Sequence, residues 1–105
     1  MKDKLQFYVN GEWVESESNE RIEVINPANE ELIGHVAAGT KGDIDKAVSA
    51  ASEAFKTYQQ TSKEDRIEIL SNIITEYENR YADFVQTITE EMGAPTWLSD
   101  KAQAS

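Results

Sequence analysis

The segment SKEDRIEILSNIITEYENRYADFVQTITEEMGAP (residues 62–95) decides how this chain folds, because it carries the most persistent apolar pattern in the sequence. Apolar side chains recur in it at steps of three and four residues, the spacing that lines one face of an α-helix. They are Ile67, Leu70, Ile74, Tyr77, Tyr81, Phe84, Val85, Ile88 and Met92. Because a span of about thirty residues is long for a globular helix, we expect a kink or break near Glu78 to Asp83.

The ends of this helical segment are also indicated. Ser62 followed three residues later by Asp65 resembles a capping box, in which each side chain bonds the other residue's backbone N–H. Gly93 accepts the left-handed backbone angles that close a helix, and Pro95 prevents the helix from resuming. The pattern therefore predicts helical structure over about residues 63–92.

Two further helices are predicted, one on each side of this segment. Thr40 and Asp43 repeat the capping pattern and begin a helix over about residues 41–59, whose alanine-rich face permits close approach to another backbone. Thr96 is expected to cap a last helix, which begins at Trp97 and runs over about residues 97–105.

Before these helices, the sequence predicts two β-hairpins within about residues 5–37. Asn10-Gly11 is the dipeptide that most readily accepts the positive φ angles of a type I′ turn. This turn should place Tyr8 opposite Trp13, where the two rings interact across the strands.

The second hairpin is expected to pair residues 22–25 with residues 32–37. The residues between them have turn chemistry, because Pro27 has a preset φ angle and Asn26 and Asn29 can accept hydrogen bonds from the nearby backbone.

Composition narrows the classes of function. With 105 residues, the chain is one small domain or a piece of a larger one. Its formal net charge of −10 repels phosphate backbones and anionic membrane surfaces, so we expect no nucleic-acid and no membrane partner. Without a membrane-length apolar run or a secretory leader, a cytoplasmic protein is expected. The absence of cysteine excludes a cysteine nucleophile within these residues.

Motifs for catalysis or phosphate binding are missing from the sequence. His35, the only histidine, lies in a predicted strand, where we expect a solvent-facing or locally satisfied side chain rather than a catalytic one. Glu90 and Glu91 are consecutive, and consecutive helical residues do not face each other, so they are not a carboxylate pair. Glu90 is expected on a solvated face. Glu91 lies nearer the helix end, where free carbonyl oxygens can share a cation with a carboxylate.

Several short motifs occur in one order along nearly the whole chain. They are Tyr8-Val9-Asn10-Gly11-Glu12-Trp13, Val24-Ile25-Asn26-Pro27-Ala28, Ile33-Gly34 with Val36 and Gly39, Asp43-Ile44-Asp45 with Ala47-Val48, Ala50-Ala51, Ala54-Phe55, Arg66, Ile69-Leu70, and Glu90-Glu91-Met92-Gly93 with Pro95. Together they resemble the N-terminal region of the NAD(P)-dependent aldehyde dehydrogenase superfamily. A mild departure is Ala94, where the family often has lysine.

The resemblance implies an α/β fold, in which N-terminal β-hairpins and long amphipathic helices form an incomplete part of a modified Rossmann-like nucleotide-binding domain. It implies oxidation of a small-molecule aldehyde to a carboxylic acid with NAD or NADP, through a cysteine thiolate, hydride transfer and thioester hydrolysis. The family places its catalytic and cofactor-binding residues downstream, so the resemblance assigns none of them to this chain. The complete protein is expected to be a homodimer or homotetramer.

One site of the family lies partly within these residues. Many members hold a structural sodium or potassium ion with a strand carbonyl and with an acid just before the closing glycine. Those positions match Ile25, or Val24 as the alternative carbonyl donor, and Glu91. The resemblance also implies that Trp97 and Leu98 begin a helix near the aldehyde entrance.

Two other functions remain open. A CoA-acylating semialdehyde dehydrogenase would share this region, because the residues that admit water or CoA lie elsewhere. An autonomous acidic helical interaction module would instead offer a helix groove to a basic or apolar partner. Continuation beyond Ser105 into a long chain with a cysteine and a glycine-rich nucleotide loop would favour the enzyme, and a stop codon there would favour the module.

Overall fold

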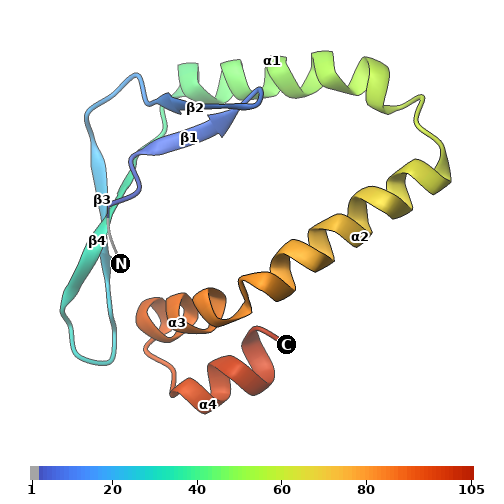
Figure 1. Cartoon of the computed structure of the whole chain (residues 1–105). Coiled ribbons are helices and arrows are strands. Elements are labelled where there is room, and N and C mark those ends of the chain that lie inside the picture. The colour runs from blue at the N-terminus through green and yellow to red at the C-terminus, as the bar shows by residue number, and fades with distance from the viewer. Residues whose placement is uncertain (1–2) are drawn as a thin grey trace. The chain divides into compact units, whose positions relative to one another are not determined.

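A computed structural model describes residues 3–105, in which strands come first and helices follow (Figure 1). In chain order the elements are β1 (Gln6–Val9), β2 (Glu12–Glu15), β3 (Arg21–Ile25), β4 (Leu32–Ala37), α1 (Lys41–Tyr58), α2 (Lys63–Asn79), α3 (Tyr81–Met92), α4 (Thr96–Leu98) and the π-helical turn η1 (Ser99–Gln103). They belong to two compact units. One unit contains residues 3–23 and Gly34–Thr61, and the other contains Val24–Ile33 and Ser62–Ser105.

The first unit begins with the predicted hairpin of β1 and β2. The strands are antiparallel, and Tyr8 pairs with Trp13 with 5.1 Å between ring centroids, as predicted. Asn10 and Gly11 have φ angles of 53° and 79°, so the dipeptide provides the two left-handed residues that the turn requires.

The residues just before β1 pair with a different strand. Lys4 forms a parallel bridge with Val36 of β4. Its backbone N–H donates to the carbonyl of His35 at 2.7 Å, and its carbonyl accepts from the N–H of Ala37 at 3.2 Å. The chain therefore pairs first with β4 and then, a few residues later, with β2.

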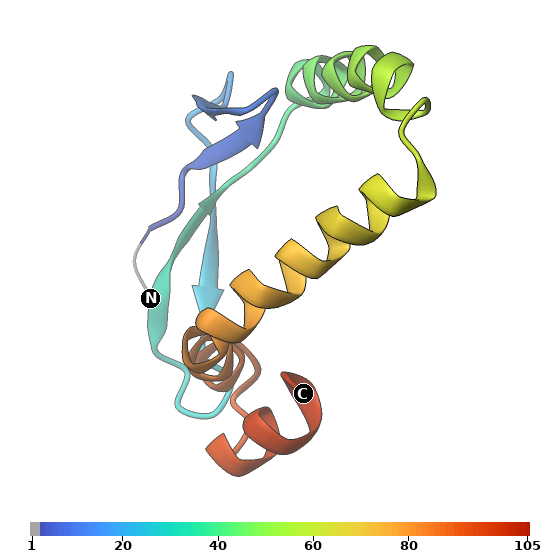
Figure 2. The same ribbon diagram turned by 45° about the vertical axis from the view of Figure 1, so that its right-hand side comes forward.

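Helix α1 lies beside β1 in both ribbon views (Figures 1 and 2). The predicted capping box is confirmed, because the Thr40 hydroxyl accepts from the backbone of Asp43 and the Asp43 carboxylate accepts from the backbone of Thr40. The alanine-rich face lines a groove of about 240 Å³ together with the hairpin tip. Its residues are Tyr8, Val9, Asn10, Ala47, Ala50, Ala51 and Ala54. Ala51 and Ala54 are exposed in this groove, so the described residues do not show the close approach to another backbone that we expect along this face.

The N-terminus of α1 is held to the preceding loop by one carboxylate. Asp43 accepts hydrogen bonds from the Ser16 hydroxyl at 2.7 Å, from the Thr40 N–H at 3.0 Å and from the Glu17 N–H at 3.1 Å. These bonds, the Ser16 bond foremost, lower the pKa of Asp43 to about 2.

In the second unit, the long helical segment breaks where the sequence predicted. Helix α2 ends at Asn79 and α3 begins at Tyr81, with Arg80 at φ −112° and ψ 14° between them. The capping box of Ser62 and Asp65 is also confirmed, with bonds of 3.0 and 3.1 Å.

The C-terminal residues pack against the end of α2 and against α3. Tyr77 stacks on Phe84 with 4.6 Å between ring centroids. The hydroxyls of Tyr77 and Tyr81 donate to the carbonyls of Ala104 and Asp100. Burial and the bond to Asp100 raise the pKa of Tyr81. These contacts make the most enclosed part of the unit.

One predicted cap is wrong. Thr96 is the first residue of α4 rather than its cap, and no side-chain hydrogen bond caps this short helix. Pro95 takes the cap position in an extended conformation, with φ −60° and ψ 144°, and its carbonyl accepts from the N–H groups of Leu98 and Ser99. The φ angle of Pro95 is compatible with a helix, so its extended ψ angle is what places it outside α4.

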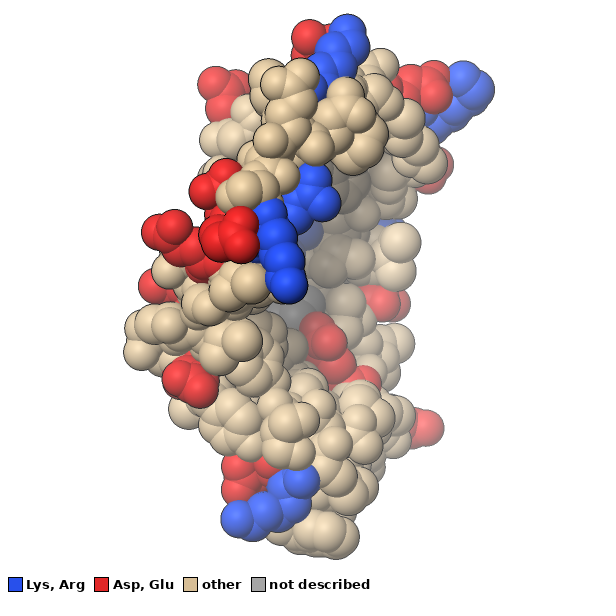
Figure 3. All heavy atoms as spheres, turned by 90° about the vertical axis from the view of Figure 1, so that its right-hand side faces the viewer, with Lys and Arg blue, Asp and Glu red and all other residues tan. Residues whose placement is uncertain are grey.

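Little of the described chain is buried. Within residues 3–105, only Gly34, Ser99 and Ala104 are fully enclosed. Figure 3 shows charged side chains scattered among larger uncharged areas on the face it draws. Large apolar side chains of the helices are more than half exposed, including Ile44, Val48, Phe55, Ile67, Leu70, Ile73 and Ile74.

Candidate functional site

The end of α3 meets the turn between β3 and β4, and both segments belong to the second unit. Gly93 closes α3 with φ 67°, and its N–H donates to Thr89. A Cβ added to Gly93 would lie 2.8 Å from the backbone nitrogen of Ala28 and 3.0 Å from Cγ of Pro27. Only glycine therefore permits this approach, and it brings together two motifs that are far apart in the sequence.

The turn itself is held by its asparagines, as predicted. Oδ1 of Asn26 accepts from the N–H of Ala28 at 2.9 Å, and Oδ1 of Asn29 accepts from the N–H of Glu31 at 3.0 Å. The backbone of Asn26 also pairs with Glu31 and Glu30, which closes the turn. A rigid turn gives the helix end a defined surface to pack on.

A polar groove of about 320 Å³ lies where the turn and α3 meet. It is lined by Asn26, Asn29, Glu31, Leu32, Ile33 and Glu90. Glu90, which we expected on a solvated face, is therefore partly enclosed. A hydrogen bond from the Gln86 side chain lowers the pKa of Glu90 and keeps its carboxylate charged. No local pattern predicts this partial enclosure of Glu90, because the groove depends on how α3 meets the turn.

The predicted cation ligands belong to α3 and β3, the elements next to this contact. Glu91 is in the last turn of α3 and is exposed, whereas Ile25 ends β3 and Val24 beside it is half-buried. Within residues 3–105, there is no cluster of three or more histidine, cysteine or acidic side chains that could hold a metal ion. Any cation here would therefore need carbonyl oxygens and further ligands from elsewhere.

His35 forms hydrogen bonds with Asp3 on another segment rather than with its local neighbours. Its Nδ1 lies 3.0 Å from Oδ1 of Asp3, and its backbone N–H donates to the same oxygen at 2.9 Å. Arg21 approaches the other oxygen of Asp3 at 3.7 Å. These interactions, the His35 side-chain bond foremost, lower the pKa of Asp3. The side chains tie the segment before β1 to β4.

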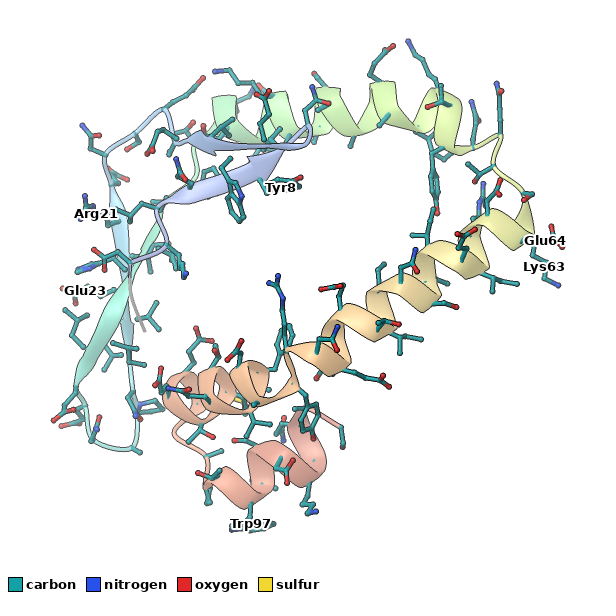
Figure 4. All side chains as sticks on the ribbon, in the orientation of Figure 1. Tyr8, Arg21, Glu23, Lys63, Glu64 and Trp97 are labelled. Carbon is teal, nitrogen blue, oxygen red and sulfur yellow. The ribbon has the colours of Figure 1, made fainter. Side chains whose placement is uncertain are left out.

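An apolar groove of about 510 Å³ runs along α2 and the start of α3. Its lining residues are Ile69, Asn72, Ile73, Glu76, Tyr77, Arg80 and Phe84. Trp97, on α4, is 66% exposed and points away from α3 (Figure 4). Both features expose large apolar side chains, and such surfaces are suited to packing.

No helix within residues 3–105 is both long and apolar enough to cross a lipid bilayer.

Comparison with known proteins gives one consistent family. The model of the "Aldehyde dehydrogenase family" matches residues 13–104. A protein of Staphylococcus aureus (strain bovine RF122 / ET3-1), provisionally named an aldehyde dehydrogenase, is 56% identical over 101 residues, which are 96% of this chain and 21% of that protein.

Solved structures point to the same family. The crystal structure of an aldehyde dehydrogenase from Bartonella henselae is 38% identical, with a TM-score of 0.96 over 99% of this chain and 22% of that one. A variant of aldehyde dehydrogenase C from Pseudomonas syringae, in complex with NAD+ and octanal, is 37% identical, with a TM-score of 0.91 over 94% of this chain and 20% of that one. The chain thus spans about a fifth of the length of the relatives it matches. These 105 residues belong to the aldehyde dehydrogenase family, of which they form the N-terminal segment.

Proposed function

We propose that this chain is the N-terminal part of an enzyme that oxidises an aldehyde to a carboxylic acid with NAD or NADP. The observation that carries the proposal is the match of nearly the whole chain, in sequence and in fold, to aldehyde dehydrogenases about five times its length. In such an enzyme, the nicotinamide accepts the hydride and a cysteine carries the acyl group. The chain contains no cysteine, so the nucleophile belongs to other residues.

The residues of this chain have structural roles in the proposal. They begin a modified Rossmann-like nucleotide-binding domain, which the rest of the polypeptide completes. The Asn10-Gly11 turn sets the first hairpin, and the contact of Gly93 with Pro27 and Ala28 fixes the end of α3. Trp97, exposed on α4, belongs near the aldehyde entrance.

The exposed apolar side chains support a larger protein. Ile67, Leu70 and Ile74 follow one another on a single face of α2, and each is more than half exposed. Apolar faces of this size mark contacts with other polypeptide. If the purified chain alone proved to be a compact monomer that melts cooperatively, the proposal that other residues cover these faces would be wrong.

We further propose a structural sodium or potassium ion at Glu91 and the carbonyl of Ile25, or of Val24 instead. The fit rests on the contact of Gly93 with the turn, which holds the end of α3 close to the end of β3. Hard cations bind oxygen, and the last carbonyls of a helix lack intrahelical partners. Replacement of sodium and potassium by a bulky organic cation should lower the melting temperature of the full-length protein. An equal loss in a Glu91→Gln variant would argue against Glu91 as a ligand.

The test of the main proposal is a nicotinamide-absorbance assay on the full-length protein, with a panel of aldehydes, with NAD and with NADP. We expect reduction of the nicotinamide that depends on the aldehyde and needs no CoA. An absolute requirement for CoA would instead identify a CoA-acylating semialdehyde dehydrogenase. Absence of turnover under every condition, from a folded protein, would contradict both.

A further inference from the structure

The tip of the β1–β2 hairpin exposes an asparagine that is followed by glycine. Asn10 and Gly11 are both exposed, and a Cβ added to Gly11 would meet nothing within 4 Å. The side-chain amide of Asn10 and the N–H of Gly11 have no hydrogen-bond partner within the described residues 3–105. The backbone nitrogen of Gly11 is therefore accessible to the side chain that precedes it.

We propose that Asn10 is a site of spontaneous deamidation in the folded protein. The Gly11 nitrogen, after losing its proton to hydroxide, attacks Cγ of Asn10. The new N–Cγ bond replaces the Cγ–Nδ2 bond, and the amide leaves as ammonia with a proton from water. Water then opens the cyclic imide at one of its two carbonyl carbons, which leaves aspartate or isoaspartate. The reaction consumes one water, releases one ammonia and needs no oxidant.

Three other asparagines lie in loops, where the next nitrogen is blocked. Asn26 precedes Pro27, whose nitrogen carries no proton. Asn29 precedes Glu30, whose N–H donates to the carbonyl of Asn26 at 2.8 Å.

Asn19 precedes Glu20, whose N–H donates to the Ser18 hydroxyl at 3.0 Å. Asn72 and Asn79 lie in α2, where the next N–H groups belong to the helical hydrogen-bond ladder. Each of the five other asparagines of the sequence therefore has a reason to react slowly that Asn10 lacks.

The product would change the hairpin. Isoaspartate adds one carbon to the backbone between the two turn residues, so the paired left-handed angles of the type I′ turn no longer join the strands in register. The pairing of Tyr8 with Trp13 should loosen. The new carboxylate also adds a negative charge to a chain whose formal net charge is −10.

The test is peptide mapping of the native full-length protein after incubation in heavy-oxygen water, in mildly alkaline and in mildly acidic buffer. Trypsin releases Leu5–Arg21, so Asn10 and Asn19 are compared within one peptide by fragmentation. We expect Asn10 to deamidate at least about tenfold faster than any other asparagine, because a backbone N–H that donates a hydrogen bond must first break that bond before its nitrogen can react. The rate should rise with pH.

The matched control is Asn10→Gly, which keeps a dipeptide suited to the type I′ turn and removes the amide. Its peptide should gain no acidic product at this position. The proposal is overturned if another asparagine deamidates as fast as Asn10. It is also overturned if Asn10 stays intact in the native protein over an incubation that is long enough to deamidate it in the denatured protein.

Discussion

Replacement of Gly93 by alanine tests the contact that brings the end of α3 to the β3–β4 turn. Alanine would have to adopt φ 67°, which is left-handed. Its Cβ would also lie 2.8 Å from the nitrogen of Ala28, 3.0 Å from Cγ of Pro27 and 3.1 Å from Cβ of Ala28. The nitrogen of Ala28 belongs to the backbone of a turn held by hydrogen bonds, so moving it away would itself cost stability.

Two costs add in this variant. The left-handed conformation costs a residue with a Cβ about 1–2 kcal/mol, and overpacking of a close contact typically costs about 1–3 kcal/mol. We therefore expect Gly93→Ala to lower the free energy of unfolding by about 2–5 kcal/mol.

Gly11→Ala is the matched control. Gly11 has φ 79°, but nothing lies within 4 Å of the position of its Cβ. This variant should show only the conformational cost of about 1–2 kcal/mol. Urea denaturation of the full-length protein, followed by tryptophan fluorescence, measures both. If the two variants lose the same stability, the close packing of Gly93 on the turn is not present in solution.

Three smaller predictions concern the first unit. Because its pKa is lowered to about 2 from 3.8, the Asp43 carboxylate stabilises the fold above about pH 4, and this contribution is lost as pH falls through about 2. Urea titrations in acid should show this loss of stability in the wild type and not in Asp43→Asn. Thr40→Ala removes the cap of α1 and should cost about 1 kcal/mol in the same measurement at neutral pH, whereas no loss would show that the cap is dispensable. A double-mutant cycle of Tyr8→Ala and Trp13→Ala should give a coupling free energy of about 0.5–1 kcal/mol, and a value of zero would mean that the ring pair does not stabilise the hairpin.

The sequence predicted those elements whose signals are local. Asn10-Gly11 specifies a turn because both residues tolerate positive φ, and the capping box of Ser62 and Asp65 needs only residues three apart. The break at Arg80 followed from length alone. In the turn and the capping box, the residues that carry the signal also form the structure, whereas the break followed from the length of the whole segment.

Features that depend on distant residues were not predictable in the same way. The groove that partly encloses Glu90 exists because Gly93 packs on Pro27 and Ala28, more than sixty residues earlier. Thr96 has the side-chain chemistry of a cap, but the helix begins one residue earlier than this pattern predicts, with Pro95 extended and its carbonyl accepting the first helical hydrogen bonds. The partner of His35 was likewise a matter of tertiary structure, since Asp3 lies on another segment.

Helix α2 has a complete N-terminal cap but an exposed apolar face, and this combination has a physical cause. A 17-residue helix such as α2 is marginal in water by itself, and a capping box contributes only about 1 kcal/mol. Most helical stability in proteins comes from packing of an apolar face, yet Leu70 is 60% exposed and Ile73 is 58% exposed. The capping box thus meets the local requirement of α2, whereas its apolar face is not covered by the described residues. Because the relatives are about five times as long, our proposal that further polypeptide packs on this face explains the exposure without any defect in the sequence of α2.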